Sequence, residues 1–367
     1  MPAKPRDELP PDARTLPARY YVDPGHFLAE RERFFAGMWA CVGRESDAPN
    51  PGDAVLRDVA DESLILARGD DGTLRAFYNV CRHRGTRLLV EPESCVGRRI
   101  RCPYHAWAYD LEGRLVAAPH MDEGSRFRKA DYPLKGVALE AWDGHVFVNL
   151  AESPAPLADQ LGDLVARFRP WGMGDLRRAH RIEYDVRANW KLIFQNYSEC
   201  LHCPIIHPAL QGLSHYLSGE NEPATATVLG GRMDLRPGVE TLALGGKSPR
   251  AVLPGLPVEE RSRVYFHAIL PNLLLSLHPD YMLTHLLRPL ACDRTEIVCD
   301  VHVHPDELAR PDFDLADVVA FWDQTNRQDW NVSELTQLGL RSRAYSPGPY
   351  SDREDLLHAF DRIVADR

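Results

Sequence analysis

Residues 189 to 208 read Asn-Trp-Lys-Leu-Ile-Phe-Gln-Asn-Tyr-Ser-Glu-Cys-Leu-His-Cys-Pro-Ile-Ile-His-Pro, and they set Glu199, His202 and His207 into an apolar, helix-like run. Glu199 and His202 are three residues apart, so they share a face on a helix. His207 would lie off that face, but Pro204 predicts that the helix kinks or ends there. Both imidazoles can then turn toward one point. Alone, the pattern fits a metal site and a pair of hydrogen-bonded histidines at a helix end equally well.

Two clusters of metal-binding residue types lie upstream of this stretch. Cys81-Arg-His83 and Cys102-Pro-Tyr-His105 each combine one thiolate donor with one imidazole donor. A structural zinc ion accepts two cysteines and two histidines. A Rieske [2Fe–2S] cluster takes two cysteines on one iron and two histidines on the other. From these residue types alone, both kinds of site remain open.

The composition is that of an ordinary globular protein. The 367 residues are 44% hydrophobic and carry a formal net charge of -10, which argues against nucleic acid as the main partner. The N-terminus lacks the apolar core of a signal peptide, and no apolar run reaches the roughly 18 residues that span a bilayer. We therefore expect a cytoplasmic protein with no membrane partner. In such a chain, paired cysteine spacings favour metal binding or catalysis over disulfides.

The hydrophobic pattern changes along the chain and predicts an α+β protein. An N-terminal arm and helix are expected over residues 1–38, and short strands with turn signals predict an all-β domain over 39–150. A proline-containing linker follows. Strands and helices over 151–367 then predict an antiparallel sheet that bears helices.

Three segments of this second domain carry more specific expectations. Residues 214–262 are rich in glycine and proline and lack sustained periodicity, which predicts an irregular loop. Residues 314–340 predict a helix with an internal bend, and residues 352–366 a closing helix. Asn189 is a plausible N-cap for the helix that opens the first stretch.

The residues around the upstream clusters resemble one known family. Asn79-Val-Cys-Arg-His-Arg-Gly and Arg101-Cys-Pro-Tyr-His-Ala-Trp are similar to the double motif in the Rieske domain of ring-hydroxylating oxygenases. The resemblance implies that Cys81 and Cys102 hold one iron of a [2Fe–2S] cluster and that His83 and His105 hold the other. It also implies a catalytic domain of the helix-grip type after the Rieske domain.

The first stretch extends the resemblance. Asn196-Tyr-Ser-Glu-Cys-Leu-His-Cys-Pro-Ile-Ile-His-Pro resembles the signature of the mononuclear iron site in the same family. Two imidazoles and one carboxylate form the facial triad of non-heme Fe(II) oxygenases. The resemblance implies His202 and His207 as ligands with Asp329, which precedes a Gln-Leu-Gly-Leu turn; Asp323 is the alternative carboxylate.

Glu199 occupies the place of an acidic residue that, in the family, links the two centres across subunits. The resemblance implies an electron path from His105 of one subunit through Glu199 to His202 of the next, and hence a head-to-tail homotrimer. Two other interpretations of the same residues compete. Cys200-Leu-His-Cys203 has the spacing of a redox pair, and these cysteines with His202 and His207 could bind zinc.

The family implies a set of cofactors. We expect one Rieske cluster, one mononuclear Fe(II), dioxygen as co-substrate, and electrons from NAD(P)H. The chain has no Gly-x-Gly-x-x-Gly fingerprint in a strand–helix setting. The electrons are therefore expected from a separate flavin/iron-sulfur reductase, or from a ferredoxin with its reductase.

Two C-terminal stretches, residues 270–281 and 339–354, look like the branch of choline, glycine betaine, carnitine and stachydrine monooxygenases. That likeness implies monooxygenation, by hydroxylation or oxidative N-demethylation, of a small quaternary-ammonium or N-methyl substrate such as a betaine. Aromatic faces can hold an ammonium group, and the candidates are Tyr265, Phe266, Tyr281, Trp322 and Trp330. The alternatives are an aromatic-ring hydroxylase or dioxygenase and a non-catalytic Rieske electron-transfer protein.

Overall fold

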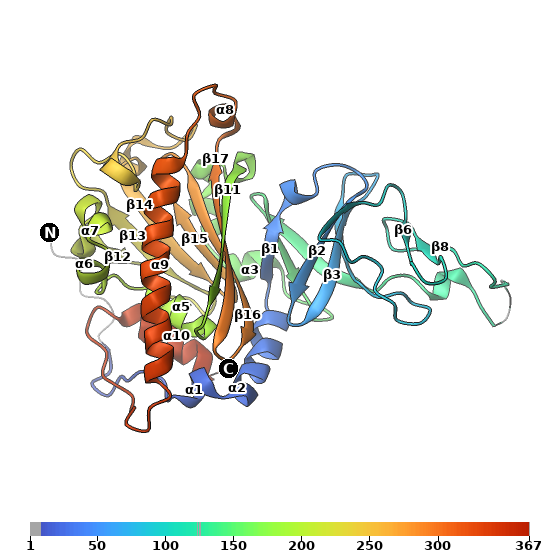
Figure 1. Cartoon of the computed structure of the whole chain (residues 1–367), viewed down its shortest axis with the longest axis horizontal. Coiled ribbons are helices and arrows are strands. Elements are labelled where there is room, and N and C mark those ends of the chain that lie inside the picture. Colours follow the sequence, from blue (N-terminus) through green and yellow to red (C-terminus); the bar gives the residue numbers. More distant parts are fainter. Residues whose placement is uncertain (1–8, 123, 125, 367) are drawn as a thin grey trace. The chain divides into compact units, whose positions relative to one another are not determined.

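The structure is a computed structural model that describes residues 9–122, 124 and 126–366 (Figure 1). The chain divides into two compact units. We call residues 34–157 the β-rich unit, and residues 1–33 with 158–367 the helix–sheet unit. Residues 1–8 of the predicted N-terminal arm lie outside the described residues. The α+β fold class is confirmed.

The β-rich unit contains two antiparallel sheets. The larger one has seven strands in the order β1-β10-β9-β4-β3-β2-β5, and the smaller one has the order β6-β7-β8. The strands are β1 Ala40–Arg44, β2 Asp53–Val59, β3 Glu62–Arg68, β4 Leu74–Tyr78, β5 Glu93–Cys95, β6 Ile100–Arg101, β7 Ala108–Tyr109, β8 Leu115–Ala117, β9 Gly136–Trp142 and β10 His145–Asn149.

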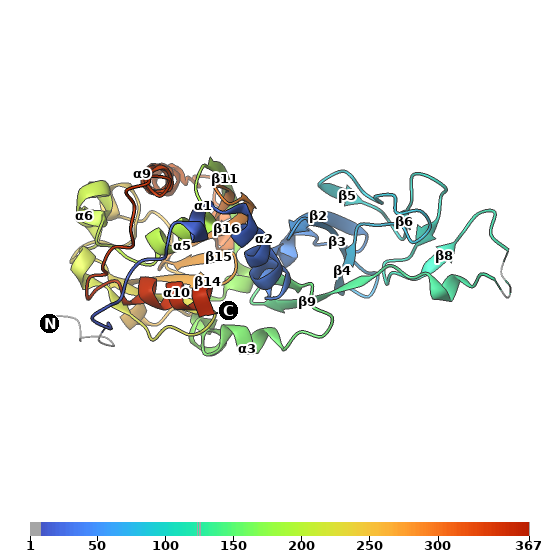
Figure 2. The ribbon, with the colours of Figure 1, turned by 90° about the horizontal axis from the view of Figure 1, so that it is seen from below.

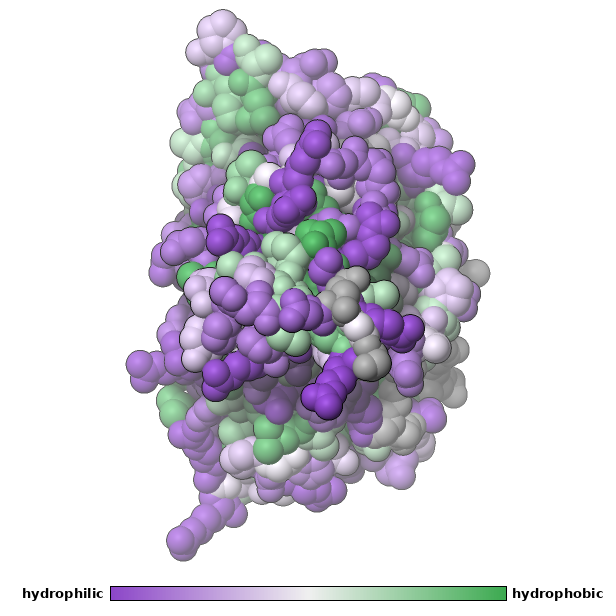
Figure 3. All heavy atoms as spheres, turned by 90° about the vertical axis from the view of Figure 1, so that its right-hand side faces the viewer, coloured by the Kyte–Doolittle hydropathy of each residue, from purple (hydrophilic) through white to green (hydrophobic). Residues whose placement is uncertain are grey.

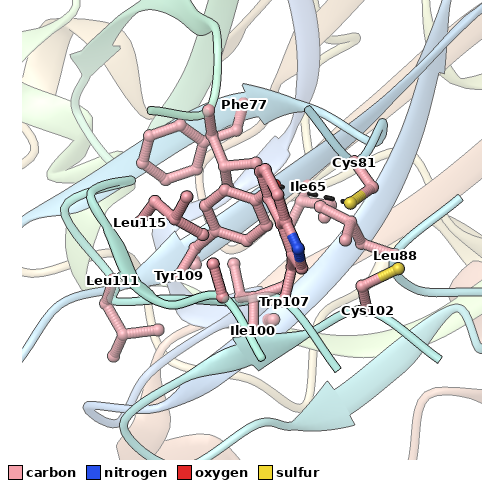
Figure 4. Close-up of a cluster of buried hydrophobic side chains, with 14 of the residues drawn as sticks. Ile65, Phe77, Cys81, Leu88, Ile100, Cys102, Trp107, Tyr109, Leu111 and Leu115 are labelled. Atoms are coloured by element: carbon pink, nitrogen blue, oxygen red, sulfur yellow. Dashed lines mark hydrogen bonds between the residues drawn. The ribbon is translucent and has the colours of Figure 1, made fainter. Parts of the chain in front are cut away.

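Side chains of both sheets meet in one apolar cluster of the β-rich unit. Cys81 and Cys102 lie at one edge of this cluster, beside Trp107, and Ile65 and Phe77 belong to it as well (Figure 4). The packing therefore places two loops, one from each predicted metal-binding motif, over a common apolar base. Such a base restrains both loops at once.

The helix–sheet unit is organised around one antiparallel sheet of seven strands. Their order is β11-β17-β16-β15-β14-β13-β12. The strands are β11 Arg177–Val186, β12 Glu220–Asn221, β13 Val228–Asp234, β14 Arg263–Ile269, β15 Leu273–Leu277, β16 Met282–Ala291 and β17 Arg294–Val303. All five residues of β15 are buried, as expected for a central strand with both faces covered.

Helices cover this sheet, and α9 runs along one of its faces (Figures 1 and 2). The helices of the chain are α1 Arg19–Val22, α2 Pro24–Glu30, α3 Leu157–Leu161, α4 Leu164–Arg167, α5 Trp190–Tyr197, α6 Cys203–Ile206, α7 Pro208–Leu213, α8 Pro305–Leu308, α9 Ala316–Gly339 and α10 Asp355–Asp366. Helix α9 is continuous over 24 residues, so the predicted bend is wrong. It contains no proline and ends at Gly339, which suits an uninterrupted helix.

The predicted irregular loop over residues 214–262 is also partly wrong, because it contains β12 and β13. The strand pattern of β13 is interrupted by Gly230 and Gly231. A Cβ at Gly230 would lie 2.4 Å from the backbone oxygen of Phe266, and a Cβ at Gly231 would meet the backbone of Glu220 as closely. The neighbouring strands approach so closely that only glycine fits at these two positions. Because glycine is unusual inside a strand, the sequence pattern does not reveal β13.

The surface shown in Figure 3 is mostly hydrophilic, with small separate groups of hydrophobic residues. Among the described residues, no helix combines the length and the apolar character needed to cross a membrane.

Candidate metal centres and the adjoining cavity

The opening stretch folds differently from the kinked helix that Pro204 predicts. Helix α5 begins after Asn189, whose side chain accepts a hydrogen bond from the backbone of Lys191, so the predicted N-cap is confirmed. The helix already ends at Tyr197, and residues 198–202 form a loop. Pro204 then stands in the first turn of the short helix α6, where its missing N–H costs nothing.

Three side chains converge where this loop faces α9. Nε2 of His207 lies 2.7 Å from Oδ1 of Asp329, and Nε2 of His202 lies 3.3 Å from the same oxygen. One ligand atom from each residue lies within 4.8 Å of the others. Two imidazole nitrogens and one carboxylate oxygen at this spacing match the donor set of a facial triad, which leaves coordination positions open.

Each of the two imidazoles also makes a hydrogen bond through its Nδ1 nitrogen. Nδ1 of His202 lies 2.6 Å from Oε1 of Glu199, and Nδ1 of His207 lies 2.8 Å from Oε1 of Gln328. An oxygen acceptor at Nδ1 fixes the proton there and leaves the Nε2 lone pair for a metal. Gln328 was missed by sequence reasoning, because only its place beside Asp329 on α9 brings it to His207.

The carboxylates set the protonation of this site when it holds no metal. Burial alone would lower the pKa of His202, but hydrogen bonds to Asp329 and Glu199 raise it to about 10. Burial acts to raise the pKa of Asp329, yet the two histidines outweigh it and lower that pKa. A divalent cation would replace the proton that these opposed groups share.

Asp323, the alternative carboxylate, does not join the three. It lies six residues before Asp329, roughly 120° away around the helix. It accepts a hydrogen bond from the hydroxyl of Tyr184 at 3.0 Å and pairs with Arg327 at 2.9 Å.

Cys200 and Cys203 form a disulfide that closes the loop around His202. The expectation that paired cysteines serve metals or catalysis rather than disulfides is wrong for this pair. The bond also removes both thiolates from the zinc site weighed above. Sγ of Cys203 lies 3.8 Å from Nε2 of His202, so the disulfide is part of the wall beside the three donors.

A cavity of about 140 Å³ opens beside the donors. Five positions of α9 line it at helical spacing, so one face of that helix forms a wall. These are Trp322, Thr325, Asn326, Asp329 and Trp330. Glu199, His202 and His207 line it as well, together with Cys200, Cys203, Tyr197, Tyr216, Arg232, Phe266, His285 and Arg353.

Three of the five predicted pocket aromatics line this cavity, namely Phe266, Trp322 and Trp330. Tyr265 does not, because neighbouring residues of a strand point to opposite faces. Its ring packs on Trp171 with centroids 5.2 Å apart. Tyr281 does not line the cavity either: it is buried behind Trp322, and its hydroxyl accepts a hydrogen bond from the indole nitrogen at 2.6 Å.

The two motif loops of the β-rich unit share one backbone design. The amide of Cys81 donates to the carbonyl of Thr86, and the amide of Cys102 donates to that of Trp107. In each loop the residue four positions after the cysteine donates back to the cysteine carbonyl and has a positive φ. These residues are Gly85 (φ 73°) and Ala106 (φ 59°). Sequence patterns alone do not show this equivalence.

The cysteines and histidines of the two motifs differ in solvent exposure. Cys81 and Cys102 are buried, while His83 is exposed and His105 is half-buried, with ring centroids of the histidines 4.8 Å apart. The hydroxyl of Tyr109 lies 3.4 Å from Sγ of Cys81 and accepts a hydrogen bond from the amide of Arg82. Two inner thiols and two outer imidazoles suit a Rieske cluster, whose two irons have different ligands.

Comparison with known proteins identifies two domains along the chain. Residues 38–138 match the Rieske [2Fe-2S] domain family, and residues 173–367 match the family described as ring hydroxylating alpha subunit (catalytic domain).

The glycine betaine monooxygenase oxygenase subunit of Chromohalobacter salexigens is 32% identical over 92% of this chain and 82% of its own length. The carnitine monooxygenase oxygenase subunit of Escherichia coli is 34% identical over 92% of this chain and 87% of its own length. Among solved structures, the quaternary ammonium Rieske monooxygenase CntA in complex with L-carnitine superposes with a TM-score of 0.80 at 26% identity, covering 98% of this chain and 99% of CntA. The chain therefore belongs to the Rieske non-heme iron oxygenases, as an α subunit of the ring-hydroxylating type.

Proposed function

We propose that the chain is the terminal oxygenase of a quaternary-ammonium monooxygenase system, with a betaine-type substrate. The observation that carries this proposal is the convergence of His202, His207 and Asp329 in a cavity whose lining also includes Phe266, Trp322 and Trp330. Members of the family carry a Rieske cluster and a mononuclear iron. Here Cys81, His83, Cys102 and His105 would hold the cluster, and the three convergent residues would hold the iron.

Residues of the chain would orient the metal ligands and line the space for the substrate. When bound, the mononuclear iron supplies the site at which dioxygen is reduced and one oxygen atom is inserted into a substrate C–H bond. Glu199 and Gln328 hold the two imidazoles in the tautomer that offers Nε2 to a metal. Phe266, Trp322 and Trp330 present aromatic surface to the cavity, on which a trimethylammonium group can rest.

Electron delivery is proposed to occur between subunits. Glu199 contacts His202 directly through Oε1, and its side chain is 14% exposed. His83 and His105 lie at the surface of the β-rich unit. A hydrogen bond from His105 of the partner subunit to Glu199 would join the two centres through one carboxylate.

Such contacts would join two different surfaces of neighbouring subunits, and a closed ring of three would form the proposed head-to-tail homotrimer. Exposed apolar side chains occur near both surfaces: Tyr104 beside His105 is 56% exposed, and Ile205 beyond His202 is 86% exposed. Electrons would reach the cluster from NAD(P)H through a separate reductase.

The direct test is oxygen consumption with a surrogate reductase. Purified protein loaded with iron and sulfide would be given NADH and one compound from each of three classes: betaines, N-methyl amines and aromatic acids. The proposal predicts uptake with a trimethylammonium compound and release of its hydroxylated or demethylated product. Uptake with the aromatic acids alone would assign the chain to ring hydroxylation instead.

A further inference from the structure

Two arginines line the cavity, and their environments differ. Arg232 is paired with two carboxylates, Glu220 at 2.5 Å and Asp234 at 2.7 Å, so its charge is already balanced. Arg353 is exposed, and among the residues that the structure describes its guanidinium has no ion-pair or hydrogen-bond partner. It is therefore a cationic group of the cavity wall whose donors remain available.

The turn that carries Arg353 is fixed by contacts on both sides. The backbone amide of Ser351 donates to Oε2 of Glu354 at 2.7 Å, and the amide of Glu354 donates back to the carbonyl of Ser351 at 3.0 Å. Asp355, the first residue of α10, accepts a hydrogen bond at Oδ1 from the side-chain Nδ2 of Asn221 on β12 at 2.9 Å. These bonds hold the turn beside the cavity and engage the carboxylates of Glu354 and Asp355, while Asp352 is exposed.

The cavity thus has two kinds of charge. The carboxylates of Glu199 and Asp329 belong to the part of the lining that includes the metal-binding residues, and Trp330, which offers an aromatic face for an ammonium group, directly follows Asp329 on α9. Arg353 adds a cationic residue to the lining of the same cavity. A guanidinium binds a carboxylate through two parallel hydrogen bonds. A zwitterion with an ammonium group and a carboxylate complements both.

We propose that Arg353 is a specificity-determining residue that binds the carboxylate of the substrate. The inference deepens the proposed function and rests on it: within the quaternary-ammonium compounds it selects carboxylate-bearing betaines over those with a neutral tail. Glycine betaine and choline are a matched pair of probes, because they share a trimethylammonium group and a two-carbon skeleton and differ in carboxylate against hydroxyl.

Calorimetric binding to the metal-loaded protein without oxygen tests this inference independently of turnover. In R353Q, the dissociation constant for glycine betaine should rise about ten-fold or more, because a charged pair is lost. That for choline should change less than two-fold, and R353K should restore part of the affinity for glycine betaine. R343Q is the matched control, since Arg343 is exposed on the preceding segment and does not line the cavity. The visible spectrum of the cluster reports whether each variant is folded.

Equal weakening of both probes in R353Q, or no weakening of either, would overturn the role of Arg353. Preference of the wild-type protein for choline would overturn it as well. Failure of the wild-type protein to bind any trimethylammonium compound would instead count against the proposed substrate class. The two failures are thus distinguished by the wild-type titration.

Discussion

Gln328 shows how much of a metal site can depend on a residue that is not a ligand. Its carboxamide oxygen accepts from Nδ1 of His207, which is 2% exposed and has no room to reorient freely. The residue before Asp329 on α9 thereby fixes the tautomer of a histidine 121 positions away in the chain. The carboxylate of Glu199 is the corresponding acceptor for Nδ1 of His202. One imidazole is therefore held by a carboxamide and the other by a carboxylate.

Replacing Gln328 with alanine should weaken iron binding about ten- to a hundred-fold, because the Nδ1 proton of His207 loses its acceptor. A chelator-competition titration of the mononuclear iron measures this, and the spectrum of the cluster should not change. Gln324→Ala, at an exposed position of the same helix, is the control. If both variants retained iron equally, Gln328 would have no positioning role.

The hydroxyl of Tyr109 is expected to affect the reduction potential of the cluster. Its hydroxyl accepts from the amide of Arg82 and is left to donate to Sγ of Cys81. Such a donor stabilises the reduced, more negative cluster. Tyr109→Phe should therefore lower the reduction potential by about 40 mV, the equivalent of about 1 kcal/mol for one electron.

Protein-film voltammetry would measure this shift. Tyr132→Phe is a suitable control, because Tyr132 packs against the same apolar cluster through its ring. An unchanged potential in Tyr109→Phe would show that the hydroxyl does not act on the cluster.

At the scale of elements, β13 depends on glycine. A Cβ at Gly230 would lie 2.4 Å from a backbone oxygen and 2.6 Å from the ring of His267. Gly230→Ala should therefore lower stability by about 2–3 kcal/mol, because neither neighbour can move without disturbing β14. Calorimetry of thermal unfolding measures the change.

Gly212→Ala provides the comparison, since Gly212 lies in α7 and an added Cβ meets nothing within 4 Å. That variant should be neutral or more stable by up to about 1 kcal/mol. Equal stability of the two variants would mean that β13 does not pack as closely as the structure shows.

Elements with a regular pattern were predictable, and those shaped by tertiary contact were not. Ile297, Cys299, Val301 and Val303 alternate as on a strand, and all four are buried on β17. The spacing of the residues around Glu199 predicts a helix, whereas the structure has a loop there. Nothing in the local sequence indicates that Cys200 and Cys203 form a disulfide. At the site, residue types and motifs indicate His202, His207 and Asp329, whereas Gln328 and Arg353 become visible only when distant segments meet.

At the scale of the whole molecule, the proposed trimer makes Ile205 an interface residue. This side chain is 86% exposed and follows the loop that carries Glu199 and His202. Ile205→Glu should shift a trimer toward monomers, because a charge would be buried between subunits without a partner. Light scattering after size-exclusion chromatography measures the mass.

Val258→Glu is the matched control for this change. Val258 is 75% exposed and lies in a short 3-10 helix (Val258–Glu260) away from the cavity lining. The account predicts that this variant remains a trimer. A monomeric wild-type protein, or a trimer unaffected by Ile205→Glu, would contradict the proposed interface.

We propose that one chain holds two iron centres and that Asp329 completes the second. Iron and sulfide counting on protein purified without oxygen distinguishes the two centres. The wild-type chain should contain about three irons, two from the cluster and one from the mononuclear site. Asp329→Ala should contain about two, with the cluster's visible spectrum unchanged. Two irons in the wild-type chain would show that it holds no mononuclear iron, and three in Asp329→Ala would show that Asp329 is not needed to bind it.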